Sequence, residues 1–272
     1  MNKYSKRYLK KSRFSTRTRT QFKSDNKPLP FSHLIELPVD LQKHIMSYIK
    51  SSQPLNKSLT KSLKIGKNMT QKQFDSLLSK LPNLKTLDIS DNKHITKIQN
   101  LPNLQQLNCA YSKIENIVNL PNLKQLICIV CTNLLNISQI PSLIDLNCEN
   151  CWSLVRLPYN LSKLKFLNMS KCDNENMFNL DNFLPNMPML EYLDCSNTNL
   201  TNLPNLPNLE CLDCSQCPHL IINETNFKIK FPKLTYLSCL NTNGCNGVMG
   251  QNTSGFGKCE NSRRHFGLNY WF

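Results

Sequence analysis

The chain has 272 residues, 40% of them apolar, and 33 Lys and Arg against 18 Asp and Glu give it a net charge of +15. This length accommodates one large domain or two small ones with a hydrophobic core. No apolar run approaches the roughly 20 residues that span a bilayer, and no apolar segment follows the basic start, so neither a membrane association nor a secretory signal is expected. We therefore expect the thirteen cysteines to be free thiols in a reducing intracellular compartment, the cytoplasm or nucleus.

Residues 1–24 form a basic arm with nine Lys or Arg and no acidic residue. Such a segment has little apolar surface to bury, which predicts disorder. An arm of this kind can bind nucleic acid or an anionic membrane surface, act as a nuclear import signal, or simply remain a solvated tail. The sequence suggests nucleic acid only weakly.

Residues 25–56 hold one predicted helix within "FSHLIELPVDLQKHIMSYIKSS", from 31 to 52. Proline is favoured at the first helical position, and here Pro38 provides the entry. Apolar residues then recur at helical spacing and form one stripe. Its members are Leu37, Leu41, Ile45 and Ile49.

The phrase "LPVDLQKHIMSYI" in this segment resembles the opening of the F-box, a helical module that docks on the Skp adaptor of cullin-RING ubiquitin ligases. The resemblance implies contacts to a Skp-type adaptor through Leu37, Pro38, Leu41 and Ile45. It covers about twenty residues, roughly half of an F-box, and the following "SSQPLNKSLTKSL" supplies little of a second helix. The alternative is that this helix only caps the first strand of the repeats that follow.

The repeat region, 57–243, opens with "LKIGKN" at 63 to 68, followed by a second predicted helix. Thr70 and Gln73 have the spacing of a capping box, in which each side chain satisfies a backbone amide of the other residue. Apolar residues follow at helical spacing. They are Phe74, Leu77, Leu78 and Leu81.

One phrase then recurs eight times, as in "LPNLKTLDIS" at 81, "LPNLQQLNCA" at 101 and "LPNLKQLICI" at 120. The second leucine of each copy stands at Leu84, Leu104, Leu123, Leu143, Leu164, Leu190, Leu209 and Leu234. The copies follow LxxLxLxxN/C and so resemble leucine-rich repeats. The fold class that this predicts is an α/β solenoid, a horseshoe with an N-terminal helical cap. About nine parallel concave strands, spaced roughly 4.8 Å apart, would alternate with mostly extended convex returns, because proline is frequent in the return segments.

The CxxC pairs of the sequence are two phases of this repeat. Ten of the thirteen cysteines occupy two inward columns, five and eight residues after the reference leucine. Thiols arranged in lines along a solenoid do not provide four ligands at one point, which argues against structural zinc. We therefore expect no metal and no cofactor.

The residues between the inward leucines are expected to face the concave surface, where solenoids usually bind their ligands. Acidic residues and aromatic residues gather there, the aromatic ones towards the C-terminal half. We predict target-binding roles for Asp88, Asp145, Asp194, Asp213, Phe166, Tyr192 and Tyr236. The expected ligand is a Lys- or Arg-containing segment of a target protein, bound between the fifth and eighth copies.

Together these features predict a monomeric, non-enzymatic adaptor. It would bind a target protein on its repeats and serve as a substrate receptor of a Skp-cullin-type ubiquitin ligase. The alternative is a plain interaction scaffold without a ligase link. Cys211 and Asp213 form a CxD that resembles the catalytic motif of bacterial leucine-rich-repeat ubiquitin ligases, but those enzymes carry it in a separate domain for which this chain has no room. A Gly-rich tail, 244–272, closes the sequence.

Overall fold

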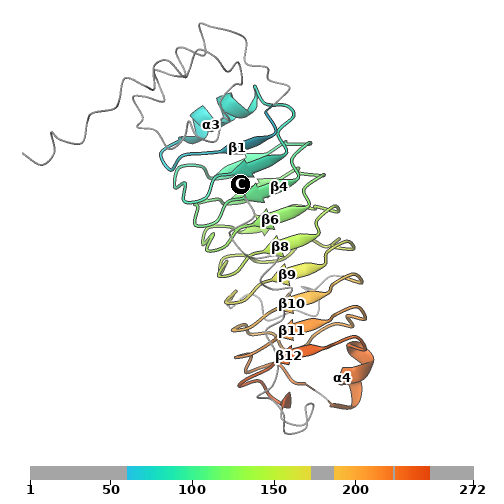
Figure 1. The fold of residues 1–272 in the computed structure, drawn as a ribbon. Coiled ribbons are helices and arrows are strands. Elements are labelled where there is room, and N and C mark those ends of the chain that lie inside the picture. Colours follow the sequence, from blue (N-terminus) through green and yellow to red (C-terminus); the bar gives the residue numbers. More distant parts are fainter. Residues whose placement is uncertain (1–59, 173–186, 223, 246–272) are drawn as a thin grey trace, which may run out of the picture.

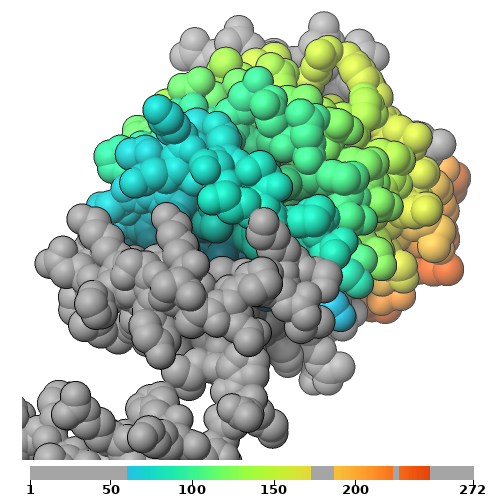
Figure 2. Space-filling model, turned by 90° about the horizontal axis from the view of Figure 1, so that it is seen from above, coloured from blue at the N-terminus to red at the C-terminus, as the bar shows by residue number. Residues whose placement is uncertain are grey.

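The computed structural model describes residues 60–172, 187–222 and 224–245. The basic arm, the predicted helix of 31–52 with its adaptor residues, and residues 246–272 lie outside the described part of the chain. Within that part, short strands stack one above another into an elongated solenoid (Figure 1). Figure 2 looks along the stack, with the first repeats in blue in front and the later ones, green to orange, behind them.

The larger sheet contains nine parallel strands, as the repeat predicts. In sheet order they are β1 (Ser62–Lys64), β2 (Thr86–Asp88), β4 (Gln106–Asn108), β6 (Gln125–Ile127), β8 (Asp145–Asn147), β9 (Phe166–Asn168), β10 (Tyr192–Asp194), β11 (Cys211–Asp213) and β12 (Tyr236–Ser238). The register aligns equivalent positions of successive copies, for example Leu87 with Leu107 and Leu126. The middle residue of each strand is a leucine that points into the core, and most of these leucines are completely buried.

A smaller parallel sheet follows the opposite, convex side. It consists of β3 (Lys97–Gln99), β5 (Asn116–Val118) and β7 (Asn136–Ile137). Ile98, Ile117 and Ile137 point inward from these strands and meet the core from the other side. The prediction of extended returns is thus confirmed for these three copies.

The "LPNL" phrase forms the turn that leads each return into the next concave strand. In one copy the Leu104 amide donates to the Leu101 carbonyl at 3.1 Å, and Pro102 takes the second position of the turn, where its fixed φ is favoured. The amide side chain of Asn103 then donates to the carbonyl of Pro82 in the preceding copy at 2.9 Å. The phrase therefore makes the turn and also ties neighbouring repeats together.

Each aligned copy turns its second corner through a residue with left-handed backbone geometry. These residues stand seven positions after the reference leucine: Asp91, Tyr111, Val130, Asn150, Lys171, Asn197, Gln216 and Asn241, with φ between 55° and 62°. Their amides continue the ladder between repeats, as when Val130 N donates to Glu149 O at 2.9 Å. Only Gly, Asn and Asp adopt this geometry readily, so a β-branched Val130 is held there by its surroundings.

The helix α3 (Gln71–Leu78) lies beside β1 at the N-terminal end (Figure 1). Its capping box is confirmed: Thr70 N donates to Gln73 Oε1 at 3.0 Å, and the Thr70 hydroxyl accepts from Gln73 N. The helix buries Phe74 in the core, and its Leu77 and Leu78 pack against the core. In the described residues no helix is long and apolar enough to cross a membrane.

A second described helix, α4 (Glu224–Lys230), lies in the return of the seventh copy and is an exception to the mostly extended returns that the sequence predicts. That copy is 25 residues long, against 19 or 20 in the first three, and its return from Ile221 to Lys230 contains no proline. The extra length therefore forms a helix, and the ring of Phe227 packs edge-on against Phe231, with centroids 4.9 Å apart.

Candidate functional site: the concave face

Polar side chains on the first concave strands are joined into one hydrogen-bonded ladder. The Thr86 hydroxyl donates to Gln106 Oε1 at 3.1 Å, and Gln106 Nε2 donates to Gln125 Oε1 at 3.4 Å. Gln125 Nε2 then donates to Asp145 Oδ2 at 2.8 Å. The in-register strands cause this order, because they place equivalent residues one strand apart.

Asp145 ends the ladder in an unusual environment. The residue is only 6% exposed, and its Oδ1 accepts no hydrogen bond from any described residue. Burial raises the pKa of this carboxyl to about 7, and the hydrogen bond from Gln125 offsets only part of the effect. The sequence predicted Asp145 as one of four target-binding acids, in a column of its own beside that of the other three, and the structure shows that its environment differs from theirs.

Beyond Asp145 the same column becomes aromatic. Phe166, Tyr192 and Cys211 are buried together in a cluster separate from the main core, and Tyr236 packs against it. Burial also raises the pKa of the Tyr192 hydroxyl. The structure thus brings together the three aromatic residues predicted from the sequence, on β9, β10 and β12.

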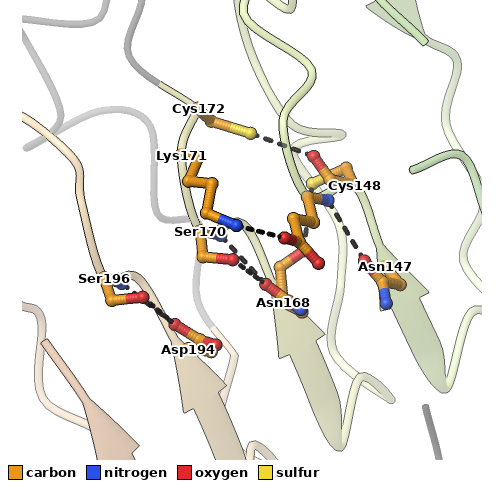
Figure 3. Close-up of polar contacts among 9 residues, drawn as sticks. Asn147, Cys148, Asn168, Ser170, Lys171, Cys172, Asp194 and Ser196 are labelled. Carbon is orange, nitrogen blue, oxygen red and sulfur yellow. Dashed lines mark hydrogen bonds and ion pairs between the residues drawn. The ribbon is translucent and has the colours of Figure 1, made fainter. Parts of the chain in front are cut away.

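The second concave column has a structural role that the sequence analysis did not recognise. Where the residue in this column is Asn or Asp, its side-chain oxygen folds over the end of the strand and accepts a hydrogen bond from the backbone amide two residues later in the chain. Asn168 Oδ1 accepts from Ser170 N at 2.9 Å, and Asp194 Oδ1 accepts from Ser196 N at 3.0 Å (Figure 3). Such local turns are the ordinary reason for Asn and Asp at strand ends.

Three predicted binding residues, Asp88, Asp194 and Asp213, belong to this column. Asp213 Oδ1 accepts from Ser215 N at 3.0 Å. Asp88 Oδ1 accepts from Ser90 N at 2.9 Å, and its other oxygen lies 3.5 Å from the Lys64 ammonium. One oxygen of each carboxylate is therefore committed to the backbone turn, just as one oxygen of Asp145 is committed to Gln125. Asp145 differs because its other oxygen is buried without a hydrogen-bond partner among the described residues.

Asp194 and Asp213 are direct partners in the register of β10 and β11, as predicted. Burial raises the pKa of Asp194 to about 6, against the lowering effect of the Ser196 hydrogen bonds and with a further contribution from Asp213. Two acids missed by the sequence analysis, Glu191 and Glu210, lie just before the same two strands, and Glu191 pairs with Lys165 at 2.7 Å. Their place one residue before each strand was readable from the alignment of copies.

The inward cysteines form two ladders of thiols in the core. The turn-position thiol of Cys151 donates to the Cys128 carbonyl at 2.9 Å, and Cys172 donates to the Cys148 carbonyl at 3.0 Å (Figure 3). Burial raises the pKa of the Cys214 thiol. These contacts confirm the interpretation of CxxC as two phases of one repeat.

The expectation of free thiols holds for nine described cysteines, all of them buried. It is wrong at the C-terminal end, where Cys239 forms a disulfide with Cys245, and Cys211 is also disulfide-bonded. Cys245 follows the last corner by a few residues, so the chain returns to the Cys239 strand end. Over the described ranges, no group of three or more His, Cys, Asp or Glu side chains is arranged to hold a metal ion.

Comparison with known proteins extends these observations only slightly. No protein-family model matches the chain, and no curated protein matches it. A similar solved structure is the functional domain of InlJ from Listeria monocytogenes, which includes a cysteine ladder. The two sequences are 20% identical, the match covers 68% of this chain and 54% of that chain, and the TM-score is 0.34. Another is the leucine-rich-repeat protein LIC12759 of Leptospira interrogans, with 18% identity, 84% and 81% coverage and a TM-score of 0.27. This chain spans about half the length of the first, and its assignment as a leucine-rich-repeat solenoid rests on its own strands and repeats.

Proposed function

We propose that this chain is a non-enzymatic, protein-binding scaffold whose concave face holds a basic segment of a target protein. The observation that carries the proposal is the composition of the two concave columns over the nine strands of the larger sheet. They contain four aspartates and one cationic residue, Lys64 on β1, which pairs with Asp88, although the whole chain has a net charge of +15. A positive segment complements such a surface, and charge of this kind mainly raises the association rate and the specificity.

The polar ladder adds amide and hydroxyl groups in a fixed arrangement along the same face. Side chains that are already ordered lose little conformational freedom on binding, so they favour recognition of an extended backbone. The aromatic cluster of Phe166, Tyr192 and Tyr236 provides apolar area at the C-terminal half. Aromatic residues commonly contribute most of the affinity at protein interfaces.

Position-dependent photo-crosslinking tests this proposal. A benzoylphenylalanine replaces Gln106 on the concave strand β4 or, as a matched control, Lys97 on the convex strand β3. We expect a discrete protein adduct in an extract of the source cells from the concave position and none from the convex position. Equal labelling from both positions, or from neither, would contradict concave binding.

We further propose that residues 25–56 recruit a Skp-type adaptor and so make the chain a substrate receptor of a ubiquitin ligase. The support is the F-box-like phrase, with Leu37, Pro38, Leu41 and Ile45 as the expected contacts; these residues lie outside the described part of the chain. An exposed apolar stripe on a helix is a typical binding element for a partner groove.

Binding of a purified Skp adaptor to the full chain tests this second part. The double substitution Leu37→Asp with Ile45→Asp should abolish binding and leave the thermal unfolding of the repeats unchanged. If the intact chain binds no adaptor and the double variant unfolds at a lower temperature, the helix is a cap of the solenoid and the ligase link is wrong.

A further inference from the structure

Asp145 lies where the two halves of the concave face meet. The polar ladder of Thr86, Gln106 and Gln125 ends at this residue, and the aromatic cluster begins on the next strand with Phe166. One carboxylate oxygen accepts from Gln125 at 2.8 Å, and the other accepts from no described residue. A buried polar atom without a partner costs about 1 to 3 kcal/mol, and more when it is charged. A donor supplied by a ligand would recover that free energy.

The flanking strands offer no such donor. Gln125 already uses its amide nitrogen on the Oδ2 atom, and the Phe166 ring has no hydrogen-bond donor. β6 and β9 contain no charged residue, and the residues directly before them are Lys124 and Lys165. Lys124 is exposed, and the ammonium of Lys165 pairs with Glu191. The side chains named on the flanking strands therefore do not supply the missing donor, and a bound partner can.

We propose that Asp145 accepts the side-chain ammonium of a lysine from the protein bound on the concave face. This inference rests on the proposed function and moves the predicted binding position from the fifth to eighth copies to the fourth. Asp145 keeps only 6% of its surface exposed and its Oδ1 atom is buried, so a ligand group reaches this atom only by displacing the side chains around it. A lysine carries a compact charge on a slender stem and needs less room than the broad, planar guanidinium of arginine. The methylene groups of that stem would pack beside the aromatic cluster.

The probe for this site is a heptalysine peptide, compared with hepta-arginine and with heptalysine acetylated on every side chain. The reporter is the side-chain amide of Gln125 in the NMR spectrum of the full chain, because this group donates to Asp145. We expect heptalysine to shift the signal saturably, hepta-arginine to bind at least about tenfold more weakly, and the acetylated peptide to have no effect. Asp145→Asn should weaken heptalysine binding at least about tenfold, and the exposed Glu115→Gln should not.

A second readout excludes a purely structural role of Asp145. Because burial raises its pKa to about 7, part of the carboxyl groups carry a proton at pH 7, and a bound ammonium displaces it. Calorimetry at pH 7 in two buffers with different ionisation enthalpies should therefore detect proton release when the peptide binds. Asp145→Asn should bind without this release.

Equal heptalysine affinity in Asp145→Asn and wild type, or hepta-arginine binding as tightly as heptalysine, would overturn the lysine site. The thermal midpoint of Asp145→Asn shows that the variant is folded, and we expect it to be at least as stable as wild type. The two proposals fail separately. A concave crosslink that persists undiminished in Asp145→Asn refutes the lysine site alone, whereas heptalysine binding at Asp145 without any concave adduct refutes the scaffold function alone.

Discussion

At the residue scale, the repeat assigns each side chain a position, and a few residues fit their positions poorly. Val130 is the clearest case, since it holds a left-handed backbone with φ of 55°. That geometry costs an L-residue with a Cβ roughly 1 to 2 kcal/mol, and it suits a β-branched side chain least. Asn150 takes the same corner in the next copy without that penalty.

A reciprocal pair of substitutions tests the cost of this corner. Val130→Asn should raise the free energy of unfolding by about 1 kcal/mol, and Asn150→Val should lower it by about 1 to 2 kcal/mol. Urea denaturation of both variants measures the difference. Shifts of the same sign in the two variants would show that side-chain packing, and not the backbone, determines stability at this corner.

The two cysteine columns should respond differently to a hydroxyl. Cys148→Ser should lower the free energy of unfolding by about 1 to 3 kcal/mol, because its thiol reaches the Asn168 carbonyl only at 3.4 Å and a shorter C–O bond leaves the hydroxyl poorly partnered. Cys151→Ser should cost less than about 1 kcal/mol. Ser112 and Thr198 already occupy the column of Cys151 in other copies. Chemical denaturation of the two variants in reducing buffer measures both changes. An equal loss of unfolding free energy in the two variants would contradict a difference between the two columns.

The buried Asp145 carboxyl predicts a pH dependence of stability. Its folded pKa of about 7 lies above the roughly 3.9 of an unfolded aspartate. Between these values the folded state binds the extra proton, so its contribution is fully present below pH 4 and is lost as the pH rises through 7. Asp145→Asn should therefore gain about 2 to 4 kcal/mol over wild type at pH 8 and much less at pH 4.5.

Chemical denaturation of wild type and Asp145→Asn across this pH range checks the sign. Glu115→Gln, an exposed acid on the convex side, is the control and should run parallel to wild type. An Asp145→Asn advantage that shrinks as the pH rises would show that the carboxylate is stabilised, and not penalised, in the fold.

At the element scale, the edge of the convex sheet is protected by one glutamine. Gln71 from α3 accepts the Thr96 and Lys97 amides on Oε1, at 3.0 and 3.2 Å, and donates to the Lys97 carbonyl at 3.0 Å. In the next copies, backbone groups of the neighbouring repeat make the equivalent hydrogen bonds, as when Glu115 N donates to Thr96 O. The side chain thus replaces the missing preceding repeat and closes an exposed strand edge.

Removal of this side chain should loosen the edge strand. Gln71→Ala should lower the free energy of unfolding by about 0.5 to 1.5 kcal/mol, since it removes hydrogen bonds to backbone groups of Thr96 and Lys97 that water can partly replace. Amide hydrogen exchange should accelerate at Thr96 and Lys97 and stay unchanged in β7. The neighbouring exposed Lys72→Ala serves as the control, and equal exchange rates in the two variants would refute the role of Gln71.

The elements that could be predicted are those dictated by periodicity. The eight reference leucines predicted parallel concave strands, and Thr70 with Gln73 predicted the start of α3. The helix α4 was missed because its copy departs in length from the pattern, and periodicity says nothing about an insertion. The left-handed corner was also missed, although Asp91, Asn150, Asn197 and Asn241 provide a signal for it.

The candidate site was less predictable because sequence position does not report hydrogen bonding. Phe166, Tyr192 and Tyr236 could be placed together, since equal positions in successive copies become neighbours. In the sequence, Asp145 stands two positions after its reference leucine and the other three aspartates stand four positions after theirs. The alignment does not report that Asp194 bonds to its own turn or that one oxygen of Asp145 is buried without a partner among the described residues.

At the scale of the whole molecule, every described repeat is attached only to its neighbours, by three-residue strands, corner amides and asparagine ties. Stability is therefore close to a sum of terms for single repeats and the interfaces between them. A pulling force applied to the two ends would act on one interface at a time and peel the repeats off successively. Each aligned copy contains 19 to 26 residues and would release about 6 to 9 nm of extended chain. The solenoid would thus lengthen under load in discrete steps, with one repeat unfolding at each step.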